Sequence, residues 1–345
     1  MKSIAIVGYG GQGAWHARCA ESSDVISLAG VYDTNENRNN AARMAGIRVY
    51  TTLDELLSDA EVDVVVCATP NDSHLEIVLR ALEAGKHVVC EKPVALSVSD
   101  FDRMCECAKK NNRIFTVHQN RRWDVDYLAI RSLVESGEIG EIINIESRIH
   151  GSRGIPSDWR RKKTQGGGMV LDWGVHLIDQ ILTLIPDKIT SVFAKTTNVT
   201  SEEVDDGFTL FIEFDSGKRA TVEVGTYNFL PLPRFYMQAT NGTAYIEDWQ
   251  KACRVARLKA WCEKDVLPVQ NAAGITKTMA PRDEVTLDVY EIPRPASDVH
   301  DFYRNLSLAI DGKCELAVKA HEVRRVLSVM QAIFESSEEG KVVKM

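Results

Sequence analysis

Short apolar runs alternate with helix-like segments through the first third of the chain, and this alternation limits the possible folds more than any other feature. Lys2–Val7 and Val62–Ala68 are continuous apolar runs of the kind that is buried on both faces of a sheet. Ser73–Ala84 carries apolar residues at helical spacing and ends at Gly85. This alternation predicts a doubly wound parallel sheet. Further strands are predicted at Ile26–Asp33, His87–Cys90 and Ile114–His118, and further helices at Ala14–Glu21, Asn37–Ala45, Ser99–Lys110 and from Thr52.

Beyond about residue 122 the pattern changes, because strict alternation of apolar and polar residues replaces the continuous apolar runs. Such alternation, with hairpin turns at 215–218 and 241–242, predicts a largely antiparallel sheet faced by helices. We therefore expect two domains, residues 1–122 and 123–345. Strands are predicted at Ile142–His150, Val192–Asn198, Phe208–Phe214, Arg219–Tyr227, Tyr236–Thr240 and Ala244–Glu247, and helices at Asp126–Glu135, Gly168–Ile185, Val299–Ile310 and His321–Glu335.

Composition excludes several classes of protein. The 41 Lys and Arg residues against 49 Asp and Glu give a net charge of −8, which offers no basis for binding a nucleic acid or an anionic membrane. The eight cysteines form no C-x-x-C pair, so neither a zinc site nor a disulfide framework is indicated. No apolar stretch approaches the roughly 20 residues of a transmembrane helix, and the N-terminus does not resemble a signal peptide. We expect a cytoplasmic protein with no metal.

A glycine-rich turn follows the first predicted strand. Gly8, Gly10 and Gly13 match G-x-G-x-x-G, with Gln12 inside the motif, and a helix is predicted to follow. Such glycines allow a tight turn and let backbone N–H groups approach a pyrophosphate. Asp33 ends the next strand and would accept hydrogen bonds from a ribose 2′-hydroxyl. The pattern predicts NAD. Two alternatives are less favoured. One is NADP, whose 2′-phosphate Arg38 could bind, and the other is a surface turn with no ligand.

Polar motifs also follow two other predicted strands. Thr69-Pro70-Asn71 comes after Val62–Ala68, and Glu91-Lys92-Pro93 comes after His87–Cys90. Both segments lie at the carboxyl ends of predicted parallel strands, which is where open α/β sheets bind their ligands. We therefore expect both to reach the ligand.

A polar stripe marks the predicted helix at 168–185. Asp172 and His176 are four residues apart, so they share a face of a regular helix, and Asp179 continues that face. A carboxylate that orients an imidazole forms an acid/base pair in which the ring moves the proton. Two alternatives stay open from these residues alone: a solvated helix face, and a metal site for which no further ligand is evident nearby.

The order of these motifs resembles the glucose–fructose oxidoreductase / inositol dehydrogenase / rhizopine-catabolism (Gfo/Idh/MocA) family. The matching motifs are G-x-G-x-x-G, T-P-N-x-x-H at Thr69–His74, E-K-P at Glu91–Pro93 and GGG-x-x-x-D-x-G-x-H at Gly166–His176. The resemblance implies a Rossmann domain followed by an α/β domain with a large, mostly antiparallel open sheet, and a homodimer or homotetramer. It also implies an NAD(P)-dependent oxidoreductase that acts on a sugar, a cyclitol or a sugar derivative.

The resemblance further implies a catalytic set of Lys92, Asp172 and His176. His176 would take the proton of a substrate hydroxyl, Lys92 would stabilise the developing alkoxide, and Asp172 would fix the geometry; whether Lys92 or His176 is the formal base stays open. The predicted cofactor-binding residues are Gly8, Gly10, Gln12, Gly13, Asp33, Thr69, Pro70, Asn71, His74, Glu91, Lys92, Asn120, Trp159 and Arg160. The predicted substrate-binding residues are Lys92, Arg122, Trp123, Arg160, Asp172 and His176.

Three functions fit these features. The first is a dehydrogenase that oxidises a secondary hydroxyl of a sugar, cyclitol or glycoside, including the 3-position of a pyranoside. The second is an enzyme that keeps its NAD and runs a closed redox cycle, as in glycosidase or epimerase chemistry. The third is a non-catalytic NAD- or sugar-sensing protein, although the joint presence of the three catalytic candidates favours catalysis. We expect substrate specificity to lie in Arg148–Lys163, Tyr227–Arg234 and Lys251–Thr286.

Overall fold

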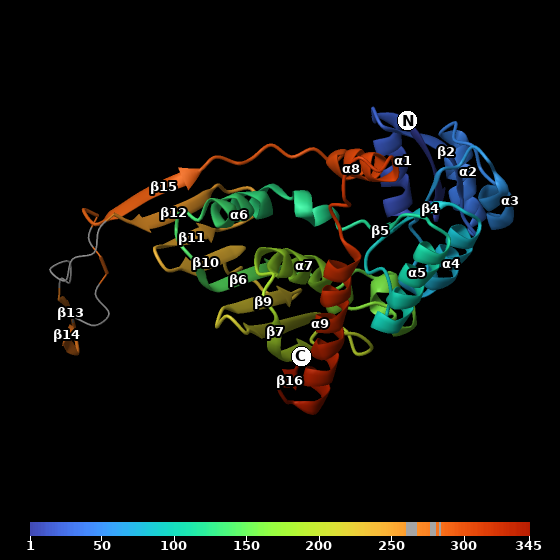
Figure 1. Cartoon of the computed structure of the whole chain (residues 1–345). Helices are drawn as coiled ribbons and strands as arrows, with labels where there is room; N and C mark the ends of the chain where they lie inside the picture. The colour runs from blue at the N-terminus through green and yellow to red at the C-terminus, as the bar shows by residue number, and fades with distance from the viewer. Residues whose placement is uncertain (260–267, 277–280, 283) are drawn as a thin grey trace.

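A five-stranded parallel sheet, drawn in blue and cyan, forms one end of the molecule (Figure 1). The computed structural model describes residues 1–259, 268–276, 281–282 and 284–345. All neighbouring strands of this sheet run parallel, in the order β2-β1-β3-β4-β5, which confirms the predicted doubly wound sheet. The strands are β1 (Lys2–Val7), β2 (Ile26–Tyr32), β3 (Val64–Cys67), β4 (His87–Cys90) and β5 (Phe115–Val117). The intervening helices are α1 (Gly11–Glu21), α2 (Glu36–Met44), α3 (Leu53–Ser58), α4 (His74–Glu83) and α5 (Val98–Lys110).

Local chemistry sets the ends of these helices. The hydroxyl of Thr52 accepts a hydrogen bond from the N–H of Glu55 at the start of α3, and Ser97 caps α5 in the same way. Gly85 follows α4 with a φ of 77°, the left-handed conformation that ends many helices. α1 begins at Gly11 rather than at Ala14, because the glycine-rich turn runs directly into the helix.

A nine-stranded sheet fills the rest of the molecule. Its strands lie in the order β15-β12-β11-β10-β6-β9-β8-β7-β16, and every neighbouring pair is antiparallel except β6 with β9. The predicted, mostly antiparallel open sheet is therefore confirmed. Its strands are β6 (Ile142–His150), β7 (Ile189–Thr197), β8 (Gly207–Phe214), β9 (Arg219–Gly225), β10 (Phe235–Ala239), β11 (Gly242–Ile246), β12 (Cys253–Leu258), β15 (Leu287–Ile292) and β16 (Val343–Lys344).

Helices cover one face of this large sheet. α6 (Val125–Ser136), α7 (Val175–Leu184) and α9 (Ala320–Glu339) lie along that face in Figure 1. Along β8, Leu210 and Ile212 are buried on the covered side, whereas Phe211 is 48% exposed on the other side. The opposite face is therefore open. A short hairpin, β13 (Val269–Asn271) with β14 (Gly274–Thr276), lies beyond the β12 and β15 edge, far from the parallel sheet.

The last part of the chain returns to the parallel sheet. α8 (Asp301–Ile310) lies beside α1 in Figure 1, and the Nζ of Lys2 pairs with a carboxylate oxygen of Asp311 at 2.7 Å. The boundary between 122 and 123 stays a prediction, and this return shows that sequence order and spatial grouping differ near the C-terminus. No helix in the described part of the chain has the length and apolar character needed to span a membrane.

The helix predicted at 168–185 is not uniform. A π-helical turn occupies Val170–Gly174, and regular α7 follows from Val175. Because a π-helical turn is wider than an α-helical turn, residues four apart within it no longer stand above one another. This irregularity changes the partner of Asp172.

Candidate active site

A cleft of about 880 Å³ opens at the carboxyl edge of the parallel sheet, where it faces the π-helical turn of the second half of the chain. The glycine-rich turn and the ends of β3, β4 and β5 contribute one side, and residues 154–176 contribute most of the other. Predicted and unpredicted residues both line it. The lining residues are Gly10, Gly11, Gln12, Arg38, Ala68, Thr69, Pro70, Asn71, Glu91, Lys92, Asn120, Arg121, Gly154, Pro156, Asp158, Trp159, Arg160, Met169, Asp172, Trp173, His176 and Thr226.

The glycine-rich turn has no room for side chains at two of its positions. A Cβ on Gly13 would lie 1.9 Å from the carbonyl oxygen of Gly8, and a Cβ on Gly8, where φ is 94°, would lie 2.7 Å from the carbonyl oxygen of Ala68. The helix N-terminus therefore approaches the turn as closely as the backbone allows, and Gly10, Gly11 and Gln12 line the cleft there. This close approach is what a dinucleotide pyrophosphate requires.

Asp33 lies behind the turn and is buried. Its Oδ2 accepts a hydrogen bond from the N–H of Tyr9 at 2.7 Å, and its Oδ1 accepts one from the N–H of Asn35 at 2.7 Å. A guanidinium nitrogen of Arg38 approaches Oδ2 at 3.3 Å. The carboxylate is thus held in place at the tip of β2, the position that contacts the adenosine ribose in dinucleotide-binding sheets.

Lys92 and Asp172 form an ion pair across the cleft wall. The Nζ of Lys92 donates to the Oδ1 of Asp172 at 3.0 Å and to the backbone oxygen of Asp172 at 2.9 Å. The other carboxylate oxygen accepts a hydrogen bond from the Nε of Arg160 at 2.8 Å. Burial alone would raise the pKa of the Asp172 carboxyl, but the positive charges of Lys92 and Arg160 outweigh it and lower that pKa. Asp172 is therefore a carboxylate that anchors two cations.

His176 and Asp172 are not joined by a hydrogen bond, contrary to the orienting bond that the sequence predicts. Asp172 lies within the π-helical turn and directs both of its oxygens to Lys92 and Arg160. Among the described residues, the buried Nδ1 of His176 has no hydrogen-bond partner. Burial, then the nearby charges of Lys92 and Arg121, hold the pKa of His176 well below its usual value of 6.5. The ring is neutral at neutral pH and can accept a proton.

Thr69, Pro70 and Asn71 line the cleft as predicted, whereas His74 lies beneath them. The two ring nitrogens of His74 face the backbone oxygens of Pro93 and Thr69 at 3.1 and 3.0 Å. The prediction that His74 contacts the cofactor is therefore replaced by a supporting position, in which it connects the loops that follow β3 and β4. Asn71 also has a structural contact, because its Nδ2 donates to the backbone oxygen of Gly166.

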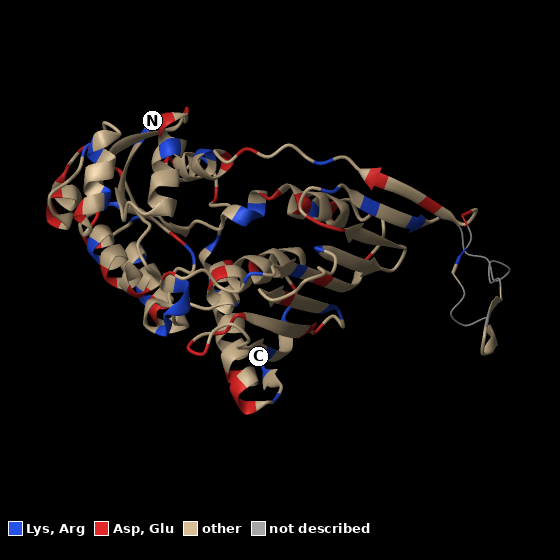
Figure 2. Cartoon of the chain, turned by 180° about the vertical axis from the view of Figure 1, so that it is seen from behind, with Lys and Arg blue, Asp and Glu red and all other residues tan. Residues whose placement is uncertain are grey.

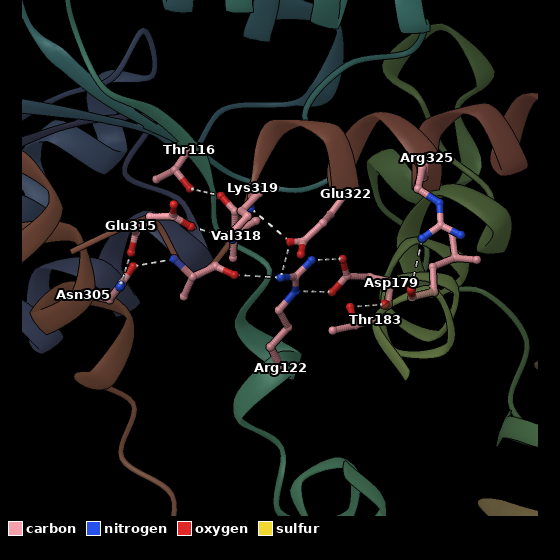
Figure 3. A network of polar contacts seen from close by, with 12 residues as sticks. Thr116, Arg122, Asp179, Thr183, Asn305, Glu315, Val318, Lys319, Glu322 and Arg325 are labelled. Carbon is pink, nitrogen blue, oxygen red and sulfur yellow. Dashed lines mark hydrogen bonds and ion pairs between the residues drawn. The ribbon is translucent and has the colours of Figure 1, made fainter. Parts of the chain in front are cut away.

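Arg122 and Trp123 do not line the cleft, so the structure does not support either as a substrate contact. The guanidinium of Arg122 is buried and donates to both carboxylate oxygens of Asp179, at 2.6 and 2.7 Å, and to Glu322 at 2.7 Å (Figure 3). Asp179, which was predicted to continue the polar face of Asp172 and His176, is therefore engaged by Arg122. Trp123 lies against a second, smaller cavity.

Comparison with known proteins agrees with this geometry. The family model described as "Oxidoreductase family, NAD-binding Rossmann fold" matches residues 2–119, and the GFO/IDH/MocA C-terminal domain matches residues 127–245. The chain belongs to the Gfo/Idh/MocA family. As a Gfo/Idh/MocA protein it is an NAD(P)-dependent oxidoreductase whose first domain binds NAD. The glycine-rich turn at Gly8–Gly13 fits that cofactor.

Solved and curated Gfo/Idh/MocA relatives extend the likeness over the whole chain. An NAD-binding protein from Listeria innocua superimposes with a TM-score of 0.95 and 43% identity, covering 100% of this chain and 99% of that chain. A scyllo-inositol 2-dehydrogenase (NADP(+)) from Bacillus subtilis is 26% identical over 99% of this chain and 95% of its own length. A 2,7-anhydro-N-acetylneuraminate hydratase from Escherichia coli is 32% identical over 72% of this chain and 68% of its own length.

Several residues that line the cleft are not predicted from the sequence. Met169 lies just before the π-helical turn, and Thr226 follows the end of β9. Neither position belongs to a sequence motif that indicates a ligand contact. Trp173 also lines the cleft, with the guanidinium of Arg121 stacked 4.3 Å from the centre of its ring.

Of the three segments expected to determine substrate specificity, one lines the cleft with residues that the structure describes. Arg148–Lys163 reaches the cleft through Gly154, Pro156 and Asp158–Arg160. Tyr227–Arg234 and the described residues of Lys251–Thr286 do not line it. Residues 260–267, 277–280 and 283 of that last segment lie outside the described residues.

Proposed function

We propose that the chain is an NAD-dependent dehydrogenase that oxidises a secondary hydroxyl of a neutral sugar, cyclitol or glycoside. The observation that carries this proposal is that an anchored ammonium and a neutral imidazole both line the same cleft. Lys92 is anchored by Asp172, and His176 is held neutral beside them. A hydroxyl bound there has a hydrogen-bond donor and a proton acceptor within one site, as alcohol oxidation requires.

The roles of the three residues follow from their contacts. Two of the three N–H groups of Lys92 are engaged by Asp172, so the third can donate to a substrate oxygen and stabilise negative charge as it develops there. His176 accepts the hydroxyl proton. Asp172 positions Lys92 rather than the imidazole. NAD, when bound, supplies the hydride acceptor.

The charge balance of the cleft favours a neutral substrate. Each of the four cations that line the described cleft already has a carboxylate partner: Lys92 with Asp172, Arg160 with Asp158 and Asp172, Arg121 with Asp124, and Arg38 with Asp33. Acidic and basic positions alternate along the ribbon over the described part of the molecule, without a segregated region of one sign (Figure 2). An anionic sugar would compete with these carboxylates for the cations, whereas a polyhydroxylated ring could pack on Trp159 and Trp173 without such competition.

The inositol dehydrogenase activity named for the Bacillus subtilis relative supports a cyclitol or sugar as the substrate class. The test is formation of NADH, followed by its absorbance, with NAD and a panel of inositols, neutral sugars, glycosides, sugar acids and nucleotide sugars. The proposal predicts turnover with a neutral ring substrate. Turnover confined to the acidic compounds would contradict it.

A second candidate is a closed redox cycle on retained NAD. The hydratase name of the Escherichia coli relative favours it, because a hydratase carries out no net oxidation. Stoichiometric NAD released by denaturing the purified protein, together with product formation without free NADH, would favour this candidate over the dehydrogenase.

We also propose a homodimer or homotetramer. Phe193 and Phe211 are exposed on the open face of the large sheet, at 38% and 48%. Exposed aromatic side chains on an uncovered sheet face favour contact with a second copy. Sedimentation velocity of the chain and of the Phe211→Lys variant tests this, since a monomer in both cases would exclude it.

A further inference from the structure

Glu91 connects the cleft to a buried pair of histidines. It lines the cleft next to Lys92, yet its side chain is almost completely buried. Its Oε1 accepts a hydrogen bond from the Nδ1 of His118 at 2.7 Å and another from the Nε2 of His16 at 2.8 Å. Burial would raise the pKa of the Glu91 carboxyl, but the two imidazoles hold it well below its usual value. Glu91 is thus a buried carboxylate.

His118 and His16 differ in what lies beyond them. The other ring nitrogen of His16, Nδ1, meets the hydroxyl of Tyr303, and both of these side chains are inaccessible to solvent. His118 instead lines a second cavity of about 100 Å³ together with Trp15, Asn120, Asp124 and Ser297. Since its Nδ1 is engaged by Glu91, Nε2 is its free nitrogen.

The second cavity is placed between the cleft and the surface. Asn120 lines both the cleft and this cavity. Ser297 and Val299 also line the cavity and are exposed, so it reaches the outside of the molecule. Its volume has room for several water molecules, and its polar walls offer them partners. The charges of Glu91 and His118 are also close enough to act on the pKa of His176.

Alcohol oxidation releases a proton that needs a route out of the cleft. Each secondary alcohol that becomes a ketone transfers one hydride and releases one proton. His176 can hold that proton only once, and it is buried. Before the next turnover the proton must leave a cleft that is occupied by cofactor and product.

We propose that Glu91 and His118 form a proton-outlet dyad for the cleft, an inference that rests on the proposed dehydrogenase function. Glu91 accepts the Nδ1–H of His118 and so leaves Nε2 as the basic nitrogen, the arrangement by which a carboxylate orients an imidazole. The Nε2 takes the substrate proton from water that passes Asn120 and becomes imidazolium. It then returns the proton to water in the second cavity, so one proton moves and no other bond changes.

The titratable groups around His118 are consistent with this direction. Glu91 and His16 lie on its inner side, with the ring of Tyr303 stacked nearby, and Asp124 faces it across the second cavity. Burial raises the pKa of the Asp124 carboxyl above its usual value. One carboxylate oxygen of Asp124 pairs with Arg121 at 2.9 Å, and the other can receive a proton on its way to the surface.

Two matched variants separate the outlet from a structural role. His118→Asn keeps an N–H donor near the position of Nδ1, and His16→Gln keeps one near the position of Nε2, so both preserve a hydrogen bond to Glu91. Rapid mixing with NAD and substrate in weak buffer would follow NADH absorbance and a pH indicator together. In the wild type, proton release should keep pace with NADH formation. In His118→Asn it should lag, and steady turnover should fall by about tenfold. His16→Gln should change neither by more than about twofold.

Chemical rescue provides a second measurement, because a purely structural role of His118 would not give rescue that depends on a basic nitrogen. His118→Ala joins the volume of the lost ring to the second cavity, so added imidazole should restore turnover in proportion to its concentration. Pyrrole, which has the same size and no basic nitrogen, should not. Equal effects of His118→Asn and His16→Gln on turnover, with proton release simultaneous with NADH in both, would overturn the proposal, and so would rescue by pyrrole.

A failure of the proposed function would be distinguishable. It would show as wild-type protein that binds NADH and forms none with any member of the panel. The dyad is then decided by nitrogen NMR of histidine-labelled protein. A proton on Nδ1 of His118 that is lost or shifted in Glu91→Gln is the expected result, and a proton fixed on Nε2 instead would overturn the assignment.

Discussion

The carboxylate of Asp172 holds the cationic groups of Lys92 and Arg160 at the cleft. Asp172→Asn would leave Lys92 without its carboxylate and Arg160 with Asp158 alone, and the freed ammonium would no longer point one N–H at the substrate. We expect kcat to fall by roughly a hundredfold, with little change in the affinity for NADH. Asp158→Asn is the control, because Asp158 pairs with Arg160 but not with Lys92. Equal losses in both variants would show that Lys92 does not depend on Asp172.

We propose that Asp33 determines which dinucleotide is preferred. Its carboxylate favours a ribose 2′-hydroxyl and repels a 2′-phosphate, while Arg38 stands beside it. Asp33→Ser would remove the repulsion and free the guanidinium, so the ratio of kcat/KM for NADP to that for NAD should rise at least about tenfold. Adding Arg38→Ala should cancel most of that gain. A preference that stays the same in the single variant would contradict the assignment of Asp33.

At the scale of elements, the approach of α1 to the end of β1 decides whether the cofactor turn can form. Gly13→Ala would place a Cβ 1.9 Å from the carbonyl oxygen of Gly8, so α1 must move away. We expect a loss of about 1–3 kcal/mol in the free energy of unfolding and a marked loss of NADH affinity, both measurable by fluorescence. Gly11→Ala is the matched control, since nothing lies within 4 Å of its Cβ. Normal NADH binding in Gly13→Ala would refute this account of the turn.

The π-helical turn shows why local periodicity was not enough. A regular helix would place Asp172 and His176 on one face, as the sequence predicts, but Val170–Gly174 is wider than an α-helical turn. Asp172 meets Lys92, 80 residues earlier in the chain, and such a partner follows only from the tertiary fold. The motif identified both residues correctly as neighbours of the cleft and paired them wrongly.

For the whole molecule, buried neutral histidines link stability to pH. The pKa of His176 is lowered by burial, so the folded chain keeps the ring neutral while the unfolded chain takes up a proton below about 6.5. Stability therefore falls as the pH drops below that value, by up to about 1.4 kcal/mol per pH unit for each such group. His176→Gln should unfold with a shallower loss of stability between about pH 6.5 and 5. His321→Gln, at an exposed position on α9, should leave the slope unchanged; identical slopes in all three proteins would contradict the link.

Much of the architecture follows from the sequence because its determinants are local. The apolar runs of β1 and β3, the glycine turn and the hairpin at 215–218 depend on neighbouring residues, and all are found where they are predicted. The parallel pairing of β6 with β9 and the return of α8 to the first sheet depend on contacts far apart in the chain. No local pattern reports them.

Arg122 illustrates the same limit for the site. The resemblance to the Gfo/Idh/MocA family implied a substrate contact for this residue. The structure gives its guanidinium to Asp179 and Glu322, on α7 and α9, and so uses it to join the two halves of the chain. A charged residue near a sheet edge can serve the ligand or the interior, and only the position of its partners decides between them.

The most direct test of the dehydrogenase assignment is the fate of the hydrogen on the carbon that bears the reacting hydroxyl. A panel substrate carrying deuterium at that carbon would be incubated with the protein and NAD, and the NADH analysed by mass spectrometry. We expect one deuterium in each NADH formed, and at least about a hundredfold slower formation in Lys92→Met. NADH without deuterium, or full activity in Lys92→Met, would contradict the assignment.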